Sequence, residues 1–211
     1  MLHVETIDRN TLVILRSLMA IKELNDFLLV GGTALSLKFG HRKSIDLDLF
    51  CTEKFENEKI KNAIETEFSD FVCTSSNKAP GVFGYIENVK VDFVKYDRYK
   101  NIKPPEIIDG IRFISTEDIA AMKIAVMLDR PRKKDYWDMS LLLDKIGIES
   151  IIDSYYKKID NAYAPIIIHR ALLDYDEMEQ QEDPVSTINE TWEYIKGNIR
   201  RHINNHLKTE F

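Results

Sequence analysis

The hydrophobic periodicity of this 211-residue chain changes once, near residues 110–116. Before that point, short alternating runs of apolar and polar residues, which are typical of strands, are mixed with helical patterns. After Thr116 the apolar residues recur at helical spacing. We therefore predict an α/β (α+β) core with a mixed sheet over residues 1–114, followed by an α-helical C-terminal region over residues 115–211.

The pattern also predicts the individual elements. In the first region the predicted helices are 7–24, 33–39 and 53–68, and the predicted strands are 27–30, 44–50, 71–73, 82–86 and 89–96. In the second region the predicted helices are 116–128, 133–146, 150–158, 163–173 and 186–206. A break is expected at Pro104-Pro105, and an acidic, solvated connection is expected at residues 174–183.

Composition excludes several classes of protein. The net charge is −6, which argues against a protein that coats nucleic acid. No apolar run reaches the roughly 18 residues of a membrane span, and the first residues lack the pattern of a secretory signal. The two cysteines, Cys51 and Cys73, have no metal-like spacing and provide no disulfide framework. We expect a cytoplasmic protein without a membrane partner.

The most informative stretch is LLVGGTALSLKFGHRKSIDLDLF, residues 28–50. It begins with a predicted strand, continues through Gly31, Gly32 and Thr33, and enters a helix. Glycines at such a turn let backbone N–H groups approach a ligand closely, and the start of a helix favours anions. The same pattern also occurs in an ordinary turn without a ligand.

Asp46 and Asp48 follow in the same stretch. Residues i and i+2 of a strand share a face, so these carboxylates lie on one side while Ile45, Leu47 and Leu49 take the core side. The two charges repel by roughly 2 kcal/mol, and a cation between them would reverse this cost. Oxygen ligands favour Mg²⁺ over Zn²⁺. An ordinary solvated strand face is the alternative.

Asp92 lies in the middle of a strongly β-forming run, Val89–Tyr96. A charge there needs a metal or a partner, and an ion pair with Lys90 or Arg98 is the alternative to a metal. Three acids on two strands can supply the ligands of a two-metal site.

Lys123 is the only charged residue in the run Ile119–Leu128. A lysine on such an apolar helix snorkels to the surface, pairs with an acid, or points into a site. Asp135 and Asp138 follow on one helix face, because they are three residues apart. Acids at that position are also typical of a solvated helix start.

Taken in order, Gly-Gly-Thr, the Asp-x-Asp pair and a later lone Asp resemble the polymerase-beta-like nucleotidyltransferases. Within that superfamily the chain resembles the AbiEii/AbiGii-type nucleotidyltransferase toxins of type IV toxin–antitoxin systems. GGTALSLKFGHRKSIDLDLF carries most of the resemblance, and STEDIAAMKIAVMLDRPRKKDYWDMSLLL, residues 115–143, adds the later Lys and Asp motif. The resemblance covers about residues 26–145.

The resemblance implies a nucleotidyltransferase core and a role for each motif position. Asp46, Asp48 and Asp92 would hold Mg²⁺, in the form of two ions. The remaining implied positions bind the nucleotide: Gly31, Gly32 and Thr33 at the triphosphate, Lys123 at a phosphate, Asp135 or Asp138 as the late acidic motif, and Arg42 near the phosphates by its place in the sequence.

The implied activity is transfer of a nucleoside monophosphate from an NTP to an RNA 3′ end, such as that of a tRNA, or to a protein hydroxyl. A cognate antitoxin is implied as a partner. Two alternatives remain open: a non-catalytic binding protein on a nucleotidyltransferase scaffold, and a metal-dependent phosphodiesterase. Gly-Gly-Thr argues against the phosphodiesterase, since a hydrolase needs no triphosphate cradle.

Overall fold

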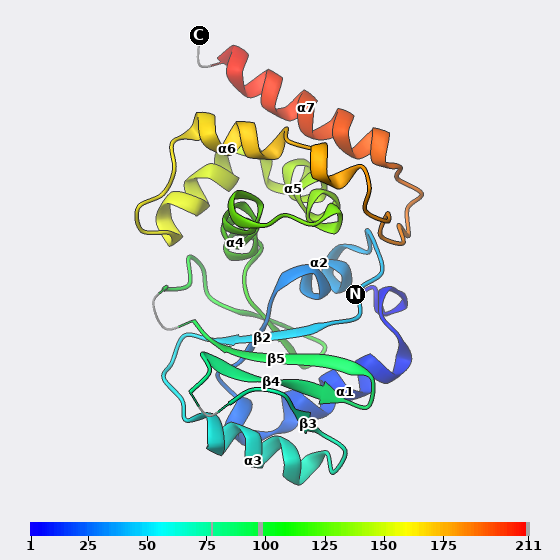
Figure 1. Ribbon diagram of the computed structural model, residues 1–211, viewed down its shortest axis with the longest axis vertical. Helices are drawn as coiled ribbons and strands as arrows, with labels where there is room; N and C mark the ends of the chain where they lie inside the picture. Colours follow the sequence, from blue (N-terminus) through cyan, green and yellow to red (C-terminus); the bar gives the residue numbers. More distant parts are fainter. Residues whose placement is uncertain (77, 97–98, 210–211) are drawn as a thin grey trace. The chain divides into compact units, whose positions relative to one another are not determined.

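A computed structural model describes residues 1–76, 78–96 and 99–209 (Figure 1). Contacts within the chain divide it into two compact units. The first unit comprises Met1–Gly40 and Ser44–Ile114, and the second comprises His41–Lys43 and Ser115–Phe211. The chain therefore leaves the first unit for three residues and then returns to it, an excursion that the sequence pattern did not predict.

The first unit is built on a mixed sheet. Over the described residues the sheet has seven strands in the order β3-β4-β5-β2-β1-β7-β6, and Figure 1 shows β2, β5, β4 and β3 side by side. The strands are β1 (Leu28–Leu29), β2 (Leu47–Cys51), β3 (Val72–Cys73), β4 (Gly81–Ile86), β5 (Val89–Lys95), β6 (Glu106–Ile108) and β7 (Ile111–Phe113). Strand β2 is parallel to β5 and antiparallel to β1. This mixed sheet with flanking helices confirms the predicted fold class.

Three helices accompany the sheet: α1 (Arg9–Ala20), α2 (Gly31–Phe39) and α3 (Asn57–Glu67), with short 3-10 turns η1 (Val4–Thr6) and η2 (Lys22–Leu24). They pack against β7, β2 and β4, respectively. The core side of the sheet is formed by alternate residues of the two central strands, such as Leu47 and Leu49 on β2 and Val91 and Phe93 on β5. The intervening residues therefore point to the opposite side, which carries the acids.

Several details of the first unit differ from the predictions. Strand β2 begins at Leu47 and not at residue 44, so Asp46 lies just before it, and the helix predicted over 7–24 ends at Ala20. Helix α2 begins at Gly31, so both glycines lie inside its first turn, whereas the prediction began at Thr33. The hairpin β6–β7 was not predicted at all. Its turn is Asp109-Gly110, and both residues have positive φ (51° and 79°), as a tight two-residue hairpin turn requires.

The second unit is helical, with α4 (Thr116–Asp129), α5 (Lys133–Lys158), α6 (Pro165–Leu172), the 3-10 turn η3 (Asp176–Met178) and α7 (Trp192–Thr209). Helix α5 kinks at Gly147, whose φ is +75°, so its halves correspond to two predicted helices. Helix α7 begins at Trp192, and the predicted start at residue 186 was wrong. No helix in the described ranges has the length and hydrophobicity needed to cross a bilayer.

An aromatic cluster forms part of the core of the second unit. The rings of Trp137 and Trp192 stack with centroids 5.6 Å apart, and Tyr136 and Tyr175 meet Trp192 edge-on. Trp137 is 1% exposed and Trp192 is 7% exposed. Both tryptophans therefore stabilise the packing of α5 against α7.

Candidate active site

Three of the predicted site residues lie on neighbouring strands of the first unit. The parallel register of β2 and β5 pairs Asp48 with Asp92, and Asp46 immediately precedes β2. All three are half-buried, on the side of the strands opposite the core residues Leu47 and Leu49. Like charges directly opposite each other on adjacent strands repel. The side that carries Asp46, Asp48 and Asp92, called the acid face below, therefore favours a bound cation.

The start of α2 lies against this acid face. Gly31 has φ +69°, and a Cβ atom built there would lie 3.2 Å from Asp48 Oδ2. Any larger residue would be strained and would press on that carboxylate. Gly31 therefore brings the first turn of α2, which also contains Gly32, close to Asp48. The free backbone N–H groups of a helix start favour an anion at this point.

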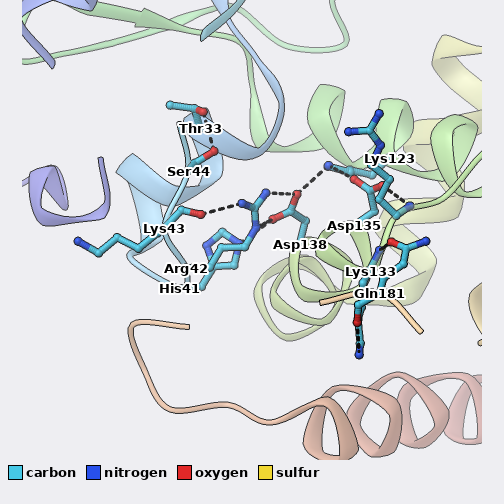
Figure 2. Close-up of polar contacts among 11 residues, drawn as sticks. Thr33, His41, Arg42, Lys43, Ser44, Lys123, Lys133, Asp135, Asp138 and Gln181 are labelled. Carbon is cyan, nitrogen blue, oxygen red and sulfur yellow. Dashed lines mark hydrogen bonds and ion pairs between the residues drawn. The ribbon is translucent and has the colours of Figure 1, made fainter. Parts of the chain in front are cut away.

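The Thr33 side chain points into the protein. It is 2% exposed, and its Oγ1 hydrogen-bonds with Ser44 Oγ at 2.8 Å (Figure 2). The same hydroxyl donates to the backbone carbonyl of Asp46. Thr33 thus fixes the chain that leads into β2, and its implied contact with a nucleotide stays a prediction.

The acid face has features that fit a metal ion. Asp92 Oδ1 is buried, and it has no hydrogen-bond partner among the described residues. A buried carboxylate oxygen without a partner is costly, and a cation would satisfy it. Across the described ranges, no three His, Cys, Asp or Glu side chains converge as a metal-binding group. The acids therefore share a face without forming a closed ligand shell.

Lys90 also lies on this face. It precedes Asp92 by two residues on β5, and its Nζ donates to Asp92 Oδ2. Burial alone would lower the pKa of Lys90, but the hydrogen bond to Asp92 and the charges of Asp92, Asp48 and Asp46 raise it overall. The ion pair that sequence analysis kept as an alternative is therefore present. Its second candidate cation, Arg98, lies outside the described residues.

Three aromatic rings continue from the acid face. Phe50 follows Asp48 by two residues on β2, and its ring centroid is 5.2 Å from that of Tyr96. Tyr96 in turn lies 4.8 Å from Tyr99. All three residues are half-buried, so parts of their rings reach solvent. This aromatic row was not predicted, although alternation along β2 already places Phe50 and Asp48 on one side.

The later motif residues form a buried ion network in the second unit, centred on Asp138 (Figure 2). Asp138 is 0% exposed, and it accepts two hydrogen bonds from Arg42, Nε at 2.7 Å and Nη2 at 2.8 Å. His41 Nε2 lies 2.7 Å from the same carboxylate. Lys123 Nζ lies 2.7 Å from Asp138 and 2.6 Å from Asp135.

The charges in this network stabilise one another. Burial alone would raise the pKa of Asp138, but Arg42 and Lys123, with hydrogen bonds from His41 and Arg42, hold it well below its usual value. Burial would likewise lower the pKa of Lys123, and Asp138 and Asp135 raise it instead. Both groups are therefore charged at neutral pH, and Lys123 is paired rather than snorkelling.

The structure thus brings Arg42, Lys123, Asp135 and Asp138 into one network. Arg42 was expected near the phosphates only because of its place in the sequence. Their implied contacts with a nucleotide stay predictions. Sequence analysis missed His41 entirely. The only available signal was its place between Gly40 and Arg42, just before the acid motif.

Most residues of the acidic connection at residues 174–183 are exposed, as expected, and contacts with Lys133 anchor its end. Lys133, the first residue of α5, donates from Nζ to the Gln181 carbonyl at 2.9 Å and pairs with Asp183 at 2.7 Å. Its backbone N–H donates to Gln181 Oε1. The Lys133 ammonium also lies 5.0 Å from the centre of the Trp192 ring. These contacts tie the connection to the start of α5.

Known structures share this fold. A crystal structure of a candidate nucleotidyltransferase from H. pylori aligns with a TM-score of 0.63, at 17% identity, over 96% of this chain and 97% of that one. The antibiotic-resistance factor ANT(2″)-Ia, in complex with adenylyl-2″-tobramycin, aligns with a TM-score of 0.54, at 20% identity, over 71% of this chain and 96% of that one. This chain therefore shares its fold with both proteins.

The particular family follows from sequence comparison. A family model described as the nucleotidyl transferase AbiEii toxin of type IV toxin–antitoxin systems matches residues 13–193. An uncharacterised protein from Aquifex aeolicus is 30% identical over 193 residues, which cover 87% of this chain and 89% of that protein. The chain belongs to the AbiEii nucleotidyltransferase family.

Proposed function

We propose that this protein is a metal-dependent nucleotidyltransferase that moves a nucleoside monophosphate from an NTP to an acceptor and releases pyrophosphate. The observation that carries the proposal is the face shared by Asp46, Asp48 and Asp92, with the glycine-led start of α2 against it. Membership of the AbiEii family supports the same activity.

In this proposal the three acids would hold two Mg²⁺ ions, whose ligands are preferentially oxygen atoms. Bound ions of this kind stabilise the attacking and leaving oxygens of an in-line displacement. Gly31 and Gly32 would let the first N–H groups of α2 approach the triphosphate. Thr33 would keep the Asp46 carbonyl, and with it the chain entering β2, in position. The protein would act mainly through positioning and charge stabilisation.

The family resemblance also assigns nucleotide contacts to Lys123, Arg42, Asp135 and Asp138. Lys123 already has two carboxylate partners, so a phosphate contact would require it to give up at least one of them. Arg42 is held by both oxygens of Asp138. In the proposed enzyme, Lys123 is the phosphate ligand and Arg42 orients the Asp138 carboxylate that holds it.

For the acceptor we favour an RNA 3′ end, such as that of a tRNA, over a protein hydroxyl. The row of Phe50, Tyr96 and Tyr99 supports this choice, since it continues from the acid face. Unpaired bases stack on aromatic rings, and each stack contributes about 1–3 kcal/mol. A protein hydroxyl would make no comparable use of this half-buried aromatic row.

The test is a labelling experiment with purified protein, Mg²⁺ and each of the four NTPs carrying label on the α-phosphate. Total RNA is the acceptor in one arm, and a protein extract freed of RNA is the acceptor in the other. Label is expected in RNA, and Asp46→Asn and Asp48→Asn should each abolish it. An NTP labelled on the γ-phosphate is the matched control, which should label nothing.

Other results of the labelling experiment would favour a different acceptor or one of the two alternative functions. Label found only in protein would replace the RNA acceptor with a protein hydroxyl. Release of nucleoside monophosphate without a labelled acceptor would favour the phosphodiesterase. NTP binding without turnover, unchanged in Asp46→Asn, would favour the non-catalytic binding protein.

The family also supports a role as the toxin of a type IV toxin–antitoxin pair, with a cognate antitoxin as partner. An NTP-consuming reaction on RNA belongs in the cytoplasm, and the two free cysteines, Cys51 and Cys73, fit a reducing compartment. Induced expression in a bacterial host should arrest growth, and Asp48→Asn should remove the arrest.

A further inference from the structure

The acid face carries its own cation. Asp48 pairs in register with Asp92, and two residues earlier in the chain lie Asp46, just before β2, and Lys90 on β5. Three negative charges and one positive charge therefore occupy four adjoining positions on one side of the sheet. Opposite charges on neighbouring positions stabilise a strand pair, whereas the Asp48–Asp92 pair alone would destabilise it.

Lys90 contacts Asp92, which is one of the predicted metal ligands. Its Nζ bonds Asp92 Oδ2, while Asp92 Oδ1 stays buried without a partner among the described residues. The Asp92 side chain is 14% exposed and that of Lys90 is 42% exposed. The carboxylate is thus held inside the protein, whereas the lysine stem reaches solvent. A long side chain in that position can leave Asp92 without disturbing the core.

We propose that Lys90 is a built-in counter-ion that competes with the divalent metal for Asp92 and so weakens metal binding to the protein alone. The inference rests on the proposed metal site. A metal at Asp92 Oδ1 and an ammonium at Oδ2 would share one carboxylate, and each would weaken the other's binding because like charges repel. Metal that arrives with an NTP brings phosphate oxygens as further ligands and displaces Lys90 more readily than metal alone.

The arrangement accounts for two features together. It offsets the repulsion between opposed acids on paired strands, and it occupies Asp92 Oδ2, an oxygen that a closed metal shell could otherwise use. The raised pKa of Lys90, to which all three acids contribute, is consistent with this coupling. Lys90 is a positioning residue, because it acts through Asp92.

The test measures Mn²⁺ binding to the full-length protein without nucleotide, by the electron paramagnetic resonance signal of free Mn²⁺. Lys90→Met removes the charge at similar length, and it should bind Mn²⁺ about five- to tenfold more tightly than wild type. Lys90→Arg keeps a cation and should stay within about twofold of wild type. The control is Lys61→Met on α3, which makes the same change of net charge at an exposed pair with Glu65.

A second readout is thermal unfolding in EDTA. Lys90→Met should melt at a lower temperature than wild type, because the acids lose their counter-ion, and added Mn²⁺ should raise its melting temperature by more than it raises that of wild type. Equal Mn²⁺ affinity for Lys90→Met and wild type would overturn the inference. So would an equal gain in Lys61→Met, since the effect would then be one of net charge.

Asp92→Asn separates this inference from the proposed function. If Asp92→Asn binds Mn²⁺ as well as Lys90→Met does, then Asp92 is not a ligand, and the proposed metal site fails together with the inference. If Asp92→Asn loses binding while Lys90→Met equals wild type, the metal site stands and only the role of Lys90 is wrong. In the double variant, removing Lys90 should give no gain in affinity.

Discussion

Asp138 is the buried carboxylate whose removal should be most costly in the second unit. Its two oxygens contact His41, Arg42 and Lys123 at 2.7–2.8 Å, and the side chain has no exposure to solvent. Asp138→Asn keeps the volume and removes the charge. Arg42 then loses the carboxylate that it binds through two N–H groups, and Lys123 keeps only Asp135.

The size of the loss follows from this geometry. Removing one partner of a buried ion pair lowers the free energy of unfolding by about 3–5 kcal/mol, because the remaining charge stays buried without compensation. An exposed pair contributes about 1 kcal/mol or less. Asp144 is on the same helix α5 with a side chain 40% exposed, and it pairs with His202 at 2.9 Å. Asp144→Asn is therefore the matched control, with an expected loss of at most about 1 kcal/mol.

Urea unfolding followed by tryptophan fluorescence measures the difference. Both tryptophans, Trp137 and Trp192, belong to the second unit, so the signal reports on the unit that contains the network. With a urea dependence of about 2–3 kcal/mol per molar, a loss of about 3–5 kcal/mol lowers the midpoint by about 1–2.5 M. A loss in Asp138→Asn no greater than that in Asp144→Asn would refute the reasoning.

The pH dependence gives a second check. The pKa of Asp138 is held well below its usual value, so its contribution to stability is complete above the unfolded-state pKa of about 3.9. That contribution is lost as the pH falls through the lower, folded-state pKa. The stability difference between wild type and Asp138→Asn should therefore be nearly constant from pH 7 to pH 5 and should shrink only below about pH 4.

Three further predictions concern the proposed activity. Mg²⁺ with the correct NTP should stabilise the protein by roughly 2.7 kcal/mol at 100 times the dissociation constant, and either alone should do less; equal melting temperatures for all four NTPs would contradict the proposal. Lys123→Met should lower transfer by roughly 10²-fold or more, and Lys123→Arg should also be impaired; an active Lys123→Met variant would shift the phosphate contact to Arg42 or Lys43. Phe50→Leu should lower transfer to RNA while NTP-dependent stabilisation persists, and unchanged transfer would remove the aromatic row from the acceptor site.

Local patterns predicted the strands that carry the acids, because alternation and burial agree along β2 and β5. Leu47 and Leu49 are buried, and Asp48 between them is half-buried, as a strand with one core side requires. The missed hairpin β6–β7 also had a local signal. Asp109-Gly110 between two short apolar runs is a strong indication of a tight hairpin turn, although the preceding Pro104-Pro105 is typical of a break.

The start of the last helix depended on a distant partner. Residues 186–190 contain no helix breaker, yet Ser186 forms an antiparallel bridge with Arg42 of the same unit. Lys43 N–H donates to the Val185 carbonyl at 2.8 Å, and Thr187 N–H donates to the His41 carbonyl at 3.2 Å. Backbone pairing over such a sequence separation satisfies groups that a helix would otherwise satisfy, and no local pattern reveals it.

Local sequence also could not reveal the partners of Lys123, and these partners limit how Lys123 can bind a phosphate. The apolar run around it indicates a buried lysine, but only the fold shows that Asp135 and Asp138 neutralise it. The network contains two carboxylates, Asp135 and Asp138, and two cations, Lys123 and Arg42, so these four charges already balance. A phosphate bound to Lys123 adds negative charge to a balanced cluster. The proposed contact therefore requires an exchange in which Arg42 keeps Asp138 while Lys123 turns from a carboxylate to the phosphate.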